Sequence, residues 1–165
     1  MGIQIKRIGH IGILVADFER SFKFYTEVLG CKVTRRYSRP DGSETGFLRF
    51  EQDHHNFVIG TAPKGANIDG GDPTHRLVQQ IAFQFEDRED WFDAIAHIRS
   101  KGVEFIREPF IHGPESGGSI EESGSRSCYF LDPDGNRLEF YTEPMMVHDD
   151  EPFPRQQYVE AFAKK

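Results

Sequence analysis

The chain has 165 residues, of which 37% are hydrophobic and 28% are charged, and its formal net charge is −7. This length predicts one globular domain, whose core needs no disulfide or structural zinc, and the acidic balance argues against nucleic acid or an anionic membrane as a partner. No apolar run is typical of a signal peptide or a membrane span, and Cys31 and Cys128 lack metal-site spacing, so we expect reduced thiols in a cytoplasmic protein.

The first predicted elements are a strand over Ile8–Val15 and the helix that follows it. Asp17 stands where a helix N-cap belongs, and the apolar residues after it recur at intervals of three and four positions. Gly30 then suits the left-handed conformation with which many helices end. Three more strands are expected, at Lys32–Tyr37, Thr45–Phe50 and Asn56–Gly60.

The second half of the chain resembles the first half at an offset of 70 residues. Aligning His10 with Gln80 also pairs Asp17 with Asp87, and Gly102 ends the second helix as Gly30 ends the first. The second copy predicts a strand over Val78–Phe85, a helix, and strands at Glu104–Ile106, Ser127–Leu131 and Arg137–Thr142. The segment Asp132-Pro133-Asp134-Gly135-Asn136 is a strong turn signal between the last two strands.

Strands and helices in this order predict an α+β fold built from two βαβββ repeats. Helices interleaved with short hairpins favour an α+β fold and argue against a doubly wound parallel sheet. We expect the two repeats to form a curved, mostly antiparallel sheet around a cavity. We expect a single domain over residues 1–143, with repeat one at about 5–60, a polar linker at 61–76 and repeat two at about 77–143. Residues 144–165 would then form a tail, with a possible helix in its last part.

Strand parity suggests a metal site. Alternate residues of a strand face the same side, so His10, Gln80 and Glu139 converge if the two copies pack around a pseudo-twofold axis. Imidazole, amide and carboxylate groups together bind divalent Fe, Mn, Ni or Zn and leave positions open for a substrate. The plainer alternatives are a hydrogen-bonded core histidine for His10 and a solvated strand residue for Glu139. His75 lies in the linker, out of phase with Gln80, and is expected at the surface.

Two stretches resemble a known superfamily. GHIGILVADFERSFKFYTEVLG is similar to the opening βα unit of vicinal oxygen chelate proteins, and SCYFLDPDGNRLEFYTE is similar to their closing hairpin. The superfamily contains glyoxalases, extradiol dioxygenases and bleomycin-resistance proteins. The resemblance covers about residues 5–143 and implies that His10 and Glu139 are metal ligands.

The sequence departs from the pattern of that superfamily at two ligand positions. The middle ligand is usually a His, where this chain has Gln80. An amide oxygen binds metal less strongly than an imidazole does, although some glyoxalases and epimerases use Gln as a ligand. A fourth ligand, Glu in many glyoxalases, would fall near Gly60, which counts against glyoxalase I.

Ring cleavage of a catechol-like substrate is the reaction that the resemblance favours. Tyr129 precedes Glu139 by ten residues, as an active-site Tyr does in extradiol dioxygenases, and the segment from His54 to Phe57 also resembles those enzymes. A bound metal would hold the substrate through adjacent oxygens, Tyr129 would donate a hydrogen bond, and His112 would move a proton. Plain packing for Tyr129 and a surface loop for His112 are the alternatives. Against ring cleavage, Gln80 breaks the usual two-His, one-carboxylate iron set.

Two other functions stay open at this point. One is a lyase, isomerase or thiol transferase of the glyoxalase type, in which the metal polarises a carbonyl. The other is a drug-binding protein similar to bleomycin-resistance proteins, with no catalysis. Residues 109–126 are rich in Gly and Ser and suit an active-site lid or a disordered loop. Single-module members of the superfamily usually dimerise, so we expect a homodimer that binds a small molecule.

Overall fold

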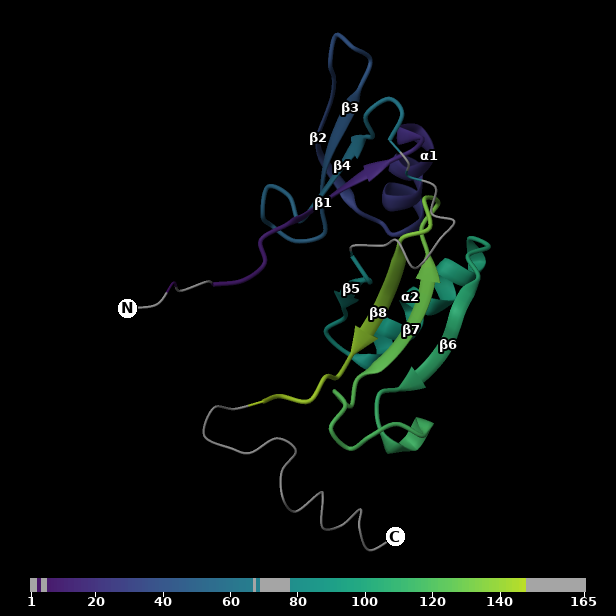
Figure 1. Ribbon diagram of the computed structural model, residues 1–165. Helices are drawn as coiled ribbons and strands as arrows, with labels where there is room; N and C mark the ends of the chain where they lie inside the picture. Colours follow the sequence, from purple (N-terminus) through teal and green to yellow (C-terminus); the bar gives the residue numbers. More distant parts are fainter. Residues whose placement is uncertain (1–2, 4–5, 67, 69–77, 148–165) are drawn as a thin grey trace, which may run out of the picture. The chain divides into compact units, whose positions relative to one another are not determined.

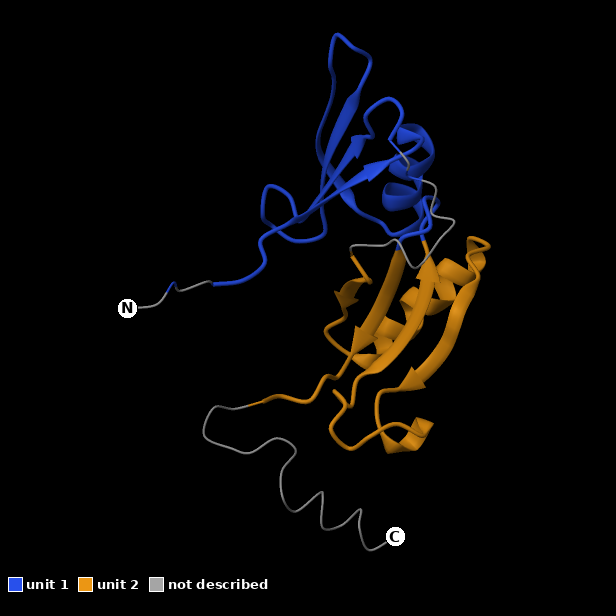
Figure 2. Ribbon diagram, in the orientation of Figure 1, with its two compact units in different colours: residues 1–76, 132–136 blue, residues 77–131, 137–165 orange. Residues whose placement is uncertain are grey.

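A computed structural model describes residue 3, residues 6–66, residue 68 and residues 78–147 (Figure 1). The chain divides into two compact units (Figure 2). Unit 1 comprises residues 1–76 and 132–136, and unit 2 comprises residues 77–131 and 137–165. Apart from residues 132–136, the division falls at the predicted boundary between the two repeats.

Unit 1 is a four-stranded mixed sheet with one helical segment. Its elements are β1 (Ile11–Val15), α1 (Phe18–Lys23), the π-helical η1 (Phe24–Val28), β2 (Lys32–Ser38), β3 (Glu44–Arg49) and β4 (Phe57–Thr61). The strand order is β1-β4-β3-β2, with β1 parallel to β4 and the other pairs antiparallel. A parallel first pair is what a βα unit followed by a hairpin meander produces.

The first helix begins and ends for the reasons that the sequence suggests. The Asp17 side chain accepts a hydrogen bond from the backbone N–H of Arg20, and Gly30 has φ of 73°. The helix is not uniform, however. Leu29 N–H donates to the carbonyl of Phe24, five residues back, so the last turn is π-helical rather than α-helical.

Unit 2 repeats this topology. Its elements are β5 (Ile81–Gln84), α2 (Arg88–Ser100), β6 (Phe105–Ile111), the 3-10 turn η3 (Pro114–Ser116), β7 (Arg126–Leu131) and β8 (Arg137–Thr142). The strand order is β5-β8-β7-β6, again with a parallel first pair. Asp87 caps α2 through the backbone N–H of Asp90, and Gly102 has φ of 76°. The predicted repeat is therefore confirmed down to its caps.

The core of unit 2 lies between α2 and one face of the sheet (Figure 1). Trp91, Ile95 and Ile98 of α2 are buried at the 3–4 spacing of an amphipathic helix. The Trp91 indole N–H donates to the carbonyl of Phe140 at 3.0 Å, which satisfies its one polar atom. Because α2 covers one face of the sheet, the side chains at alternate positions of β5, β7 and β8 are available for a site on the other face.

The predicted turn between β7 and β8 also makes hydrogen bonds to residues of unit 1. Asp132 accepts hydrogen bonds from the backbone N–H groups of Asp134 and Asn136, and Gly135 has φ of 79°. Its other carboxylate oxygen accepts from the buried Tyr25 hydroxyl at 2.7 Å. Asp134 in turn accepts from the backbone of Ala16. The turn therefore belongs to the packing of unit 1.

The α+β fold is confirmed, with corrections. Each repeat forms its own four-stranded mixed sheet, in which one strand pair is parallel and the other two are antiparallel. The first strands of the two repeats begin at Ile11 and Ile81, three residues later than predicted, whereas β6 extends to Ile111, five residues further than predicted. Most of the predicted linker beyond residue 66, including His75, and the tail from residue 148 lie outside the described residues. The single domain over residues 1–143 stays a prediction.

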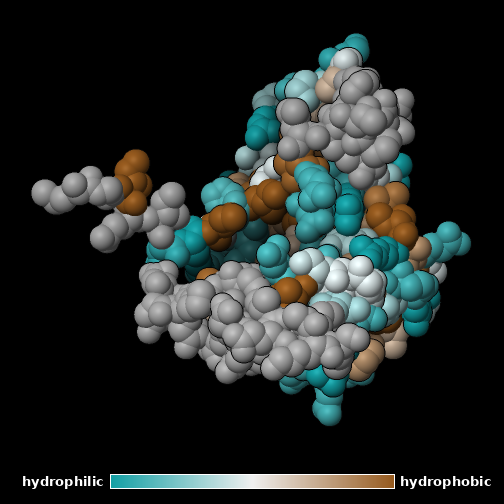
Figure 3. Space-filling view, turned by 60° about the horizontal axis from the view of Figure 1, so that its bottom comes forward, coloured by the Kyte–Doolittle hydropathy of each residue, from teal (hydrophilic) through white to brown (hydrophobic). Residues whose placement is uncertain are grey.

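Exposed hydrophobic side chains are scattered over the surface. Brown hydrophobic patches alternate with teal hydrophilic ones in the space-filling view (Figure 3). The more exposed hydrophobic residues include Ile8, Leu14, Met146 and Val147. Scattered residues of this kind are normal and do not by themselves indicate a docking surface. Among the described residues, no helix is both long and apolar enough to cross a bilayer.

Candidate active site

The candidate site lies on the face of the unit 2 sheet opposite α2. In β7 and β8, Tyr129 pairs with Glu139, and in β5 and β8, Ala82 pairs with Glu139. These positions alternate with the buried residues Cys128, Leu138 and Phe140. Glu139 and Tyr141 share this face, as alternate residues of one strand do.

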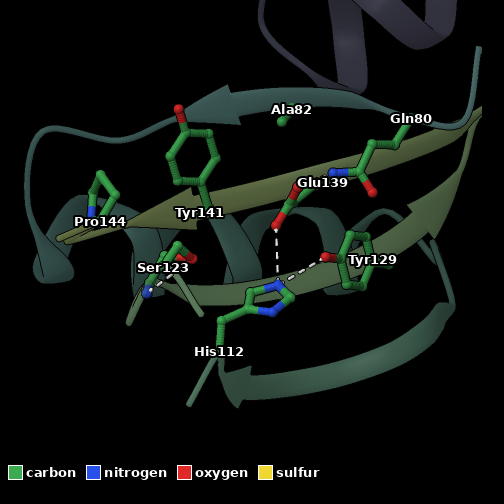
Figure 4. A pocket seen from close by; sticks show the side chains of 9 residues that line it. Gln80, Ala82, His112, Ser123, Tyr129, Glu139, Tyr141 and Pro144 are labelled. Atoms are coloured by element: carbon green, nitrogen blue, oxygen red, sulfur yellow. Dashed lines mark hydrogen bonds and ion pairs between the residues drawn. The ribbon is translucent and has the colours of Figure 1, made fainter. Parts of the chain in front are cut away.

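Side chains from β5, β7, β8 and the segments that flank them line a pocket of about 310 Å³ on this face (Figure 4). That volume is at the lower end of the range for small-molecule sites, roughly 300–1,000 Å³. Acidic, basic, amide and hydroxyl groups all occur in the lining, which consists of Gln80, Ala82, His112, Ser123, Ser125, Tyr129, Glu139, Tyr141 and Pro144. A pocket this polar suits a ligand that is recognised through oxygen atoms.

Glu139 is the central group of the pocket. It is only 6% exposed, yet its carboxylate has no Lys or Arg ion pair among the residues that the structure describes. One oxygen accepts a hydrogen bond from the Gln80 amide at 2.6 Å, and the other lies 3.7 Å from Nε2 of His112. A buried carboxylate whose partners are an amide and an imidazole is available to bind a cation or to accept a proton.

His112 is held at the end of β6 rather than in a free loop. Its backbone N–H donates to Ser125 and its carbonyl accepts from Gly124, each at 2.8 Å. Its ring faces two groups, because Nε2 lies 2.9 Å from the Tyr129 hydroxyl and Nδ1 lies 3.5 Å from a carboxylate oxygen of Glu122. A proton on Nδ1, facing Glu122, leaves Nε2 to accept a hydrogen bond from Tyr129.

Tyr129 keeps its proton at neutral pH. Burial, followed by the negative charge of Glu139, raises the pKa of its hydroxyl above the usual value of 10.0. The hydroxyl can therefore donate a hydrogen bond in this pocket, and the tautomer of His112 with its proton on Nδ1 would accept it at Nε2, 2.9 Å away. The two side chains form a short path along which a proton can move.

The structure brings together four of the five predicted site residues. Gln80, His112, Tyr129 and Glu139 line one pocket, and their catalytic and metal-binding roles stay predictions. His10 belongs to unit 1, where it is exposed just before β1 and its ring centroid lies 4.5 Å from that of His55. Its membership in the metal-ligand set stays a prediction.

Register in unit 1 corrects the position of the missing fourth ligand. Gly12 pairs with Val58 as Ala82 pairs with Glu139 in unit 2. Val58, rather than Gly60, therefore occupies the position equivalent to Glu139. The prediction that no carboxylate stands there is unchanged, since valine offers no ligand atom.

The sequence reasoning missed Glu122 and the arginine beside Tyr129. Glu122 lies in the Gly/Ser-rich stretch, and no spacing rule connects it to His112, because the contact depends on how the loop folds back. Arg137 lies two residues before Glu139, so strand parity could have placed it on the same face. Its Cζ lies 3.9 Å from the centroid of the Tyr129 ring.

The pocket offers donors for a divalent ion. The Glu139 carboxylate is adjacent to the Gln80 amide, whose nitrogen donates to it, and carboxylate and amide oxygens can both bind Fe, Mn, Ni or Zn. Within the described ranges, however, no group of three or more His, Cys, Asp or Glu side chains is arranged to hold a metal. Unit 2 thus fits part of a metal site and needs at least one further ligand.

Comparison with known proteins assigns the family. The model of the Glyoxalase/Bleomycin resistance protein/Dioxygenase superfamily matches residues 7–140. The chain belongs to this superfamily. The resemblance expected from the two end motifs is therefore confirmed.

Relatives within the superfamily have different activities in their names. The chain is 29% identical over 135 residues to a lactoylglutathione lyase of Arabidopsis thaliana, covering 81% of this chain and 43% of the relative. It is 24% identical over 144 residues to a biphenyl-2,3-diol 1,2-dioxygenase of Rhodococcus globerulus, covering 87% of this chain and 66% of the relative. The chain thus spans between about two fifths and two thirds of the length of these relatives, and they do not single out one reaction.

Solved structures support the fold. A glyoxalase family protein from Enterococcus faecalis matches with a TM-score of 0.63 and 23% identity, over 82% of this chain and 97% of that one. A fosfomycin resistance protein from Listeria monocytogenes, in complex with Mn(II) and sulfate, matches with a TM-score of 0.59 and 19% identity, over 86% and 96% of the two chains. At these identities the likeness shows the fold alone.

Proposed function

We propose that this chain is a metal-dependent enzyme whose reactive groups lie in unit 2, and that it cleaves the ring of a catechol-like substrate with O₂. The observation that carries the proposal is the cluster of Tyr129, His112 and Glu139 in one pocket, with separations of 2.9 Å and 3.7 Å along it. A donor, an acceptor and a buried carboxylate within this distance are what proton removal from a diol requires.

Glu139 and Gln80 would hold the metal, and we propose His10 as the third protein ligand. Gln80 would turn its amide oxygen toward the ion and give up its hydrogen bond to Glu139. Divalent Fe, Mn, Ni or Zn would suit this donor set. When bound, the ion would supply an electrophilic centre that lowers the pKa of the substrate hydroxyls and positions O₂ beside them.

The protein groups would manage the proton. Tyr129 holds its hydroxyl proton because of its raised pKa, so it would orient the substrate oxygen by donating a hydrogen bond. His112, 2.9 Å from that hydroxyl, would take the proton released by the diol. The net reaction breaks one ring C–C bond and forms two C–O bonds with both atoms of O₂, so no external reductant is needed.

Two curated relatives support this choice of reaction. They are biphenyl-2,3-diol 1,2-dioxygenases of Rhodococcus globerulus, at 24% and 28% identity, and this chain spans 66% and 61% of their length. We also propose that the chain forms a homodimer.

A glyoxalase-like lyase or isomerase is the second candidate. Gln80 favours it, since an amide replaces one of the two histidines that iron dioxygenases use. The same Tyr129–His112 pair would then move a proton between adjacent carbons of an α-hydroxycarbonyl compound. The lactoylglutathione lyase relative of Arabidopsis thaliana is in line with this reading.

The test is a matched pair of assays on protein purified without chelator, with its metal identified. O₂ uptake with catechol and with biphenyl-2,3-diol should occur at one O₂ per diol, with iron or manganese bound. Formation of lactoylglutathione from methylglyoxal and glutathione, with nickel or zinc bound and no O₂ uptake, would replace ring cleavage by the second candidate. A protein without metal and inactive in both assays would leave a non-catalytic drug-binding role, similar to that of bleomycin-resistance proteins.

A further inference from the structure

The arginines of unit 2 fall into two groups. Three of them form ion pairs with carboxylates on the exposed surface: Arg88 and Arg126 with Glu143, and Arg99 with Glu108. Arg107 and Arg137 have no carboxylate partner among the residues that the structure describes. Unit 1 also has arginines without a carboxylate partner among the described residues, namely Arg35, Arg39 and Arg49, so the surroundings of Arg107 and Arg137 are what distinguish them.

Neither arginine lines the pocket, but Arg137 stacks on its Tyr129 ring and Arg107 stacks on the neighbouring Phe110 ring. The Cζ atom of Arg137 lies 3.9 Å from the centroid of the Tyr129 ring, and that of Arg107 lies 3.3 Å from the centroid of the Phe110 ring. The Phe110 ring is itself 5.7 Å from the Tyr129 ring and 4.5 Å from the His112 ring, centroid to centroid. The two guanidinium groups therefore flank the aromatic cluster that carries the proposed proton path.

Arg137 also has an unsatisfied polar atom. Its Nε is buried and has no hydrogen-bond partner, the one such side-chain atom found in the described part of the chain. Buried N–H groups without an acceptor are rare because their desolvation is not compensated. The Nε–H of this guanidinium thus has no acceptor, and it lies beside the ring of Tyr129, whose pocket has the buried carboxylate of Glu139.

Stacking suits both arginines to bind a planar anion. A guanidinium packed flat on an aromatic ring is held in place while the N–H groups at its edges stay free to donate. Two such edges match the two oxygens of a carboxylate through paired, charge-assisted hydrogen bonds. Arg107 is opposite Tyr129 in the β6–β7 register, and Arg137 follows on the neighbouring strand, so both can serve one group near the Tyr129 end of the pocket.

We propose that Arg137 and Arg107 bind a carboxylate carried by the substrate. The inference rests on the proposed function for the other half of the ligand: the diol would lie at Glu139 and Tyr129 and the acid at the two arginines. The substrate class is then catechols with an acidic side chain. In unit 1, Arg35 occupies the register position of Arg107, but Asn56 occupies that of Arg137, so only unit 2 has an arginine at both positions.

The first test measures binding without any reaction. Phenylacetate and phenylacetamide have nearly the same shape and differ in charge, so calorimetric titration of the protein with each isolates the anion site. We expect phenylacetate to bind about tenfold more tightly or better, as charge-assisted hydrogen bonds require. Arg137→Gln should remove that advantage. Arg39→Gln, which removes one charge from the exposed hairpin of unit 1, should retain it.

The second test joins the site to the proposed reaction. O₂ uptake is compared for 3,4-dihydroxyphenylacetate and its amide, with wild type and Arg137→Gln. A lower KM for the acid, lost in the variant, supports both proposals. A preference for phenylacetate without O₂ uptake on either diol supports the anion site and contradicts ring cleavage. Equal KM values and equal binding of acid and amide overturn the anion site even if both diols are cleaved.

Two more variants guard against a folding defect. If Arg137→Gln unfolds, Arg137→Lys keeps the charge but not the fork, and Arg107→Gln removes the second guanidinium. Either should reduce the preference for phenylacetate while circular dichroism shows a folded protein. A full preference for phenylacetate in both folded variants would overturn the proposal. Displacement of phenylacetate by inorganic phosphate at a concentration at which acetate has no effect would also overturn it, because the site would then not select carboxylates.

Discussion

Units 1 and 2 have the same topology but carry different chemistry on the sheet face away from the helix. In unit 2, Tyr129 pairs with Glu139 across β7 and β8. At the equivalent register in unit 1, Phe47 pairs with Val58. One unit therefore presents a hydroxyl and a carboxylate where the other presents a phenyl ring and an isopropyl group.

This difference shows which part of the sequence sets the fold and which part sets the function. The residues facing the helices follow the same apolar pattern in both units, and both helices start at a capping Asp and end at a left-handed Gly. The opposite faces are free to diverge, because packing against the helix does not constrain them. If the difference between these faces sets the function, changes on the unit 2 face should reduce turnover and matched changes in unit 1 should not.

The largest effect is expected from Tyr129→Phe, which gives unit 2 the ring that unit 1 has. Loss of the hydroxyl removes the donor beside His112, so kcat should fall by about 100-fold or more. Steady-state O₂ uptake checks this. The matched control, Tyr37→Phe in unit 1, removes a hydroxyl that is not part of the pocket lining and should retain full turnover. A Tyr129→Phe protein as active as wild type would contradict the proposed proton path.

The next effect concerns stability, and it is predicted for unit 1. Asp132→Ala removes the acceptor of the buried Tyr25 hydroxyl, and it also removes the acceptor of the backbone N–H groups in the turn. An unfolding free energy lower by about 1–3 kcal/mol is expected, because a buried donor is left unpaired. Urea denaturation measures it. Asp41→Ala, in the exposed turn of the first hairpin, should cost less, and equal losses would contradict the structural role of Asp132.

Gln80→His gives unit 2 the residue that unit 1 has at the equivalent position. An imidazole should bind a divalent metal about tenfold more tightly than an amide oxygen does. A change in metal affinity of this size is typical when a group around a metal site is replaced. Competition with a fluorescent chelator measures the change. An unchanged affinity would show that position 80 does not contact the metal.

A smaller effect is expected from Glu122→Gln. Glu122 faces Nδ1 of His112 at 3.5 Å and would hold the ring and its tautomer in place. Without the charge, kcat should fall by about tenfold, as outer partners of site residues often cost, while KM stays the same. Glu121→Gln, its exposed neighbour, is the control. A change in KM alone would assign Glu122 to substrate binding instead.

The last prediction has no effect at neutral pH and grows in alkali. Burial raises the pKa of the Cys128 thiol from 9.0 to about 12, and that of Cys31 from 9.0 to about 11. Above pH 9 the unfolded chain releases these protons while the folded chain retains them, so the free energy of unfolding should fall as pH rises. Urea denaturation from pH 7 to 10.5 should show this slope, and Cys128→Ala should lessen it.

The fold could be predicted from the sequence because its signals are local and repeated. The caps at Asp17 and Asp87 and the glycines at positions 30 and 102 mark the helices, and alternation along β8 correctly assigned Glu139 to the pocket face. The π-helical turn at Phe24 was missed, because the same apolar spacing suits both kinds of helix.

Strand parity predicts Glu139, whereas Tyr129 and His112 are predicted from the resemblance to extradiol dioxygenases. Glu122 was missed because it reaches His112 only where residues 113–123 fold back between backbone hydrogen bonds at Gly124 and Ser125. The stack of Arg137 on Tyr129 depends on rotamers, which strand periodicity does not specify. His10 stays a predicted ligand.

Metal content and turnover of three proteins show whether Glu139 holds a metal that the reaction needs. The proteins are wild type, Glu139→Ala, and Val58→Ala as the matched change in unit 1. All are purified without chelator, reconstituted with Fe(II) and analysed by elemental analysis and O₂ uptake. We expect about one metal ion per chain in wild type and in Val58→Ala, and loss of both metal and turnover in Glu139→Ala, because Glu139 is a proposed metal ligand. Metal and turnover retained in Glu139→Ala, or a wild type that binds no metal after reconstitution, would contradict this expectation.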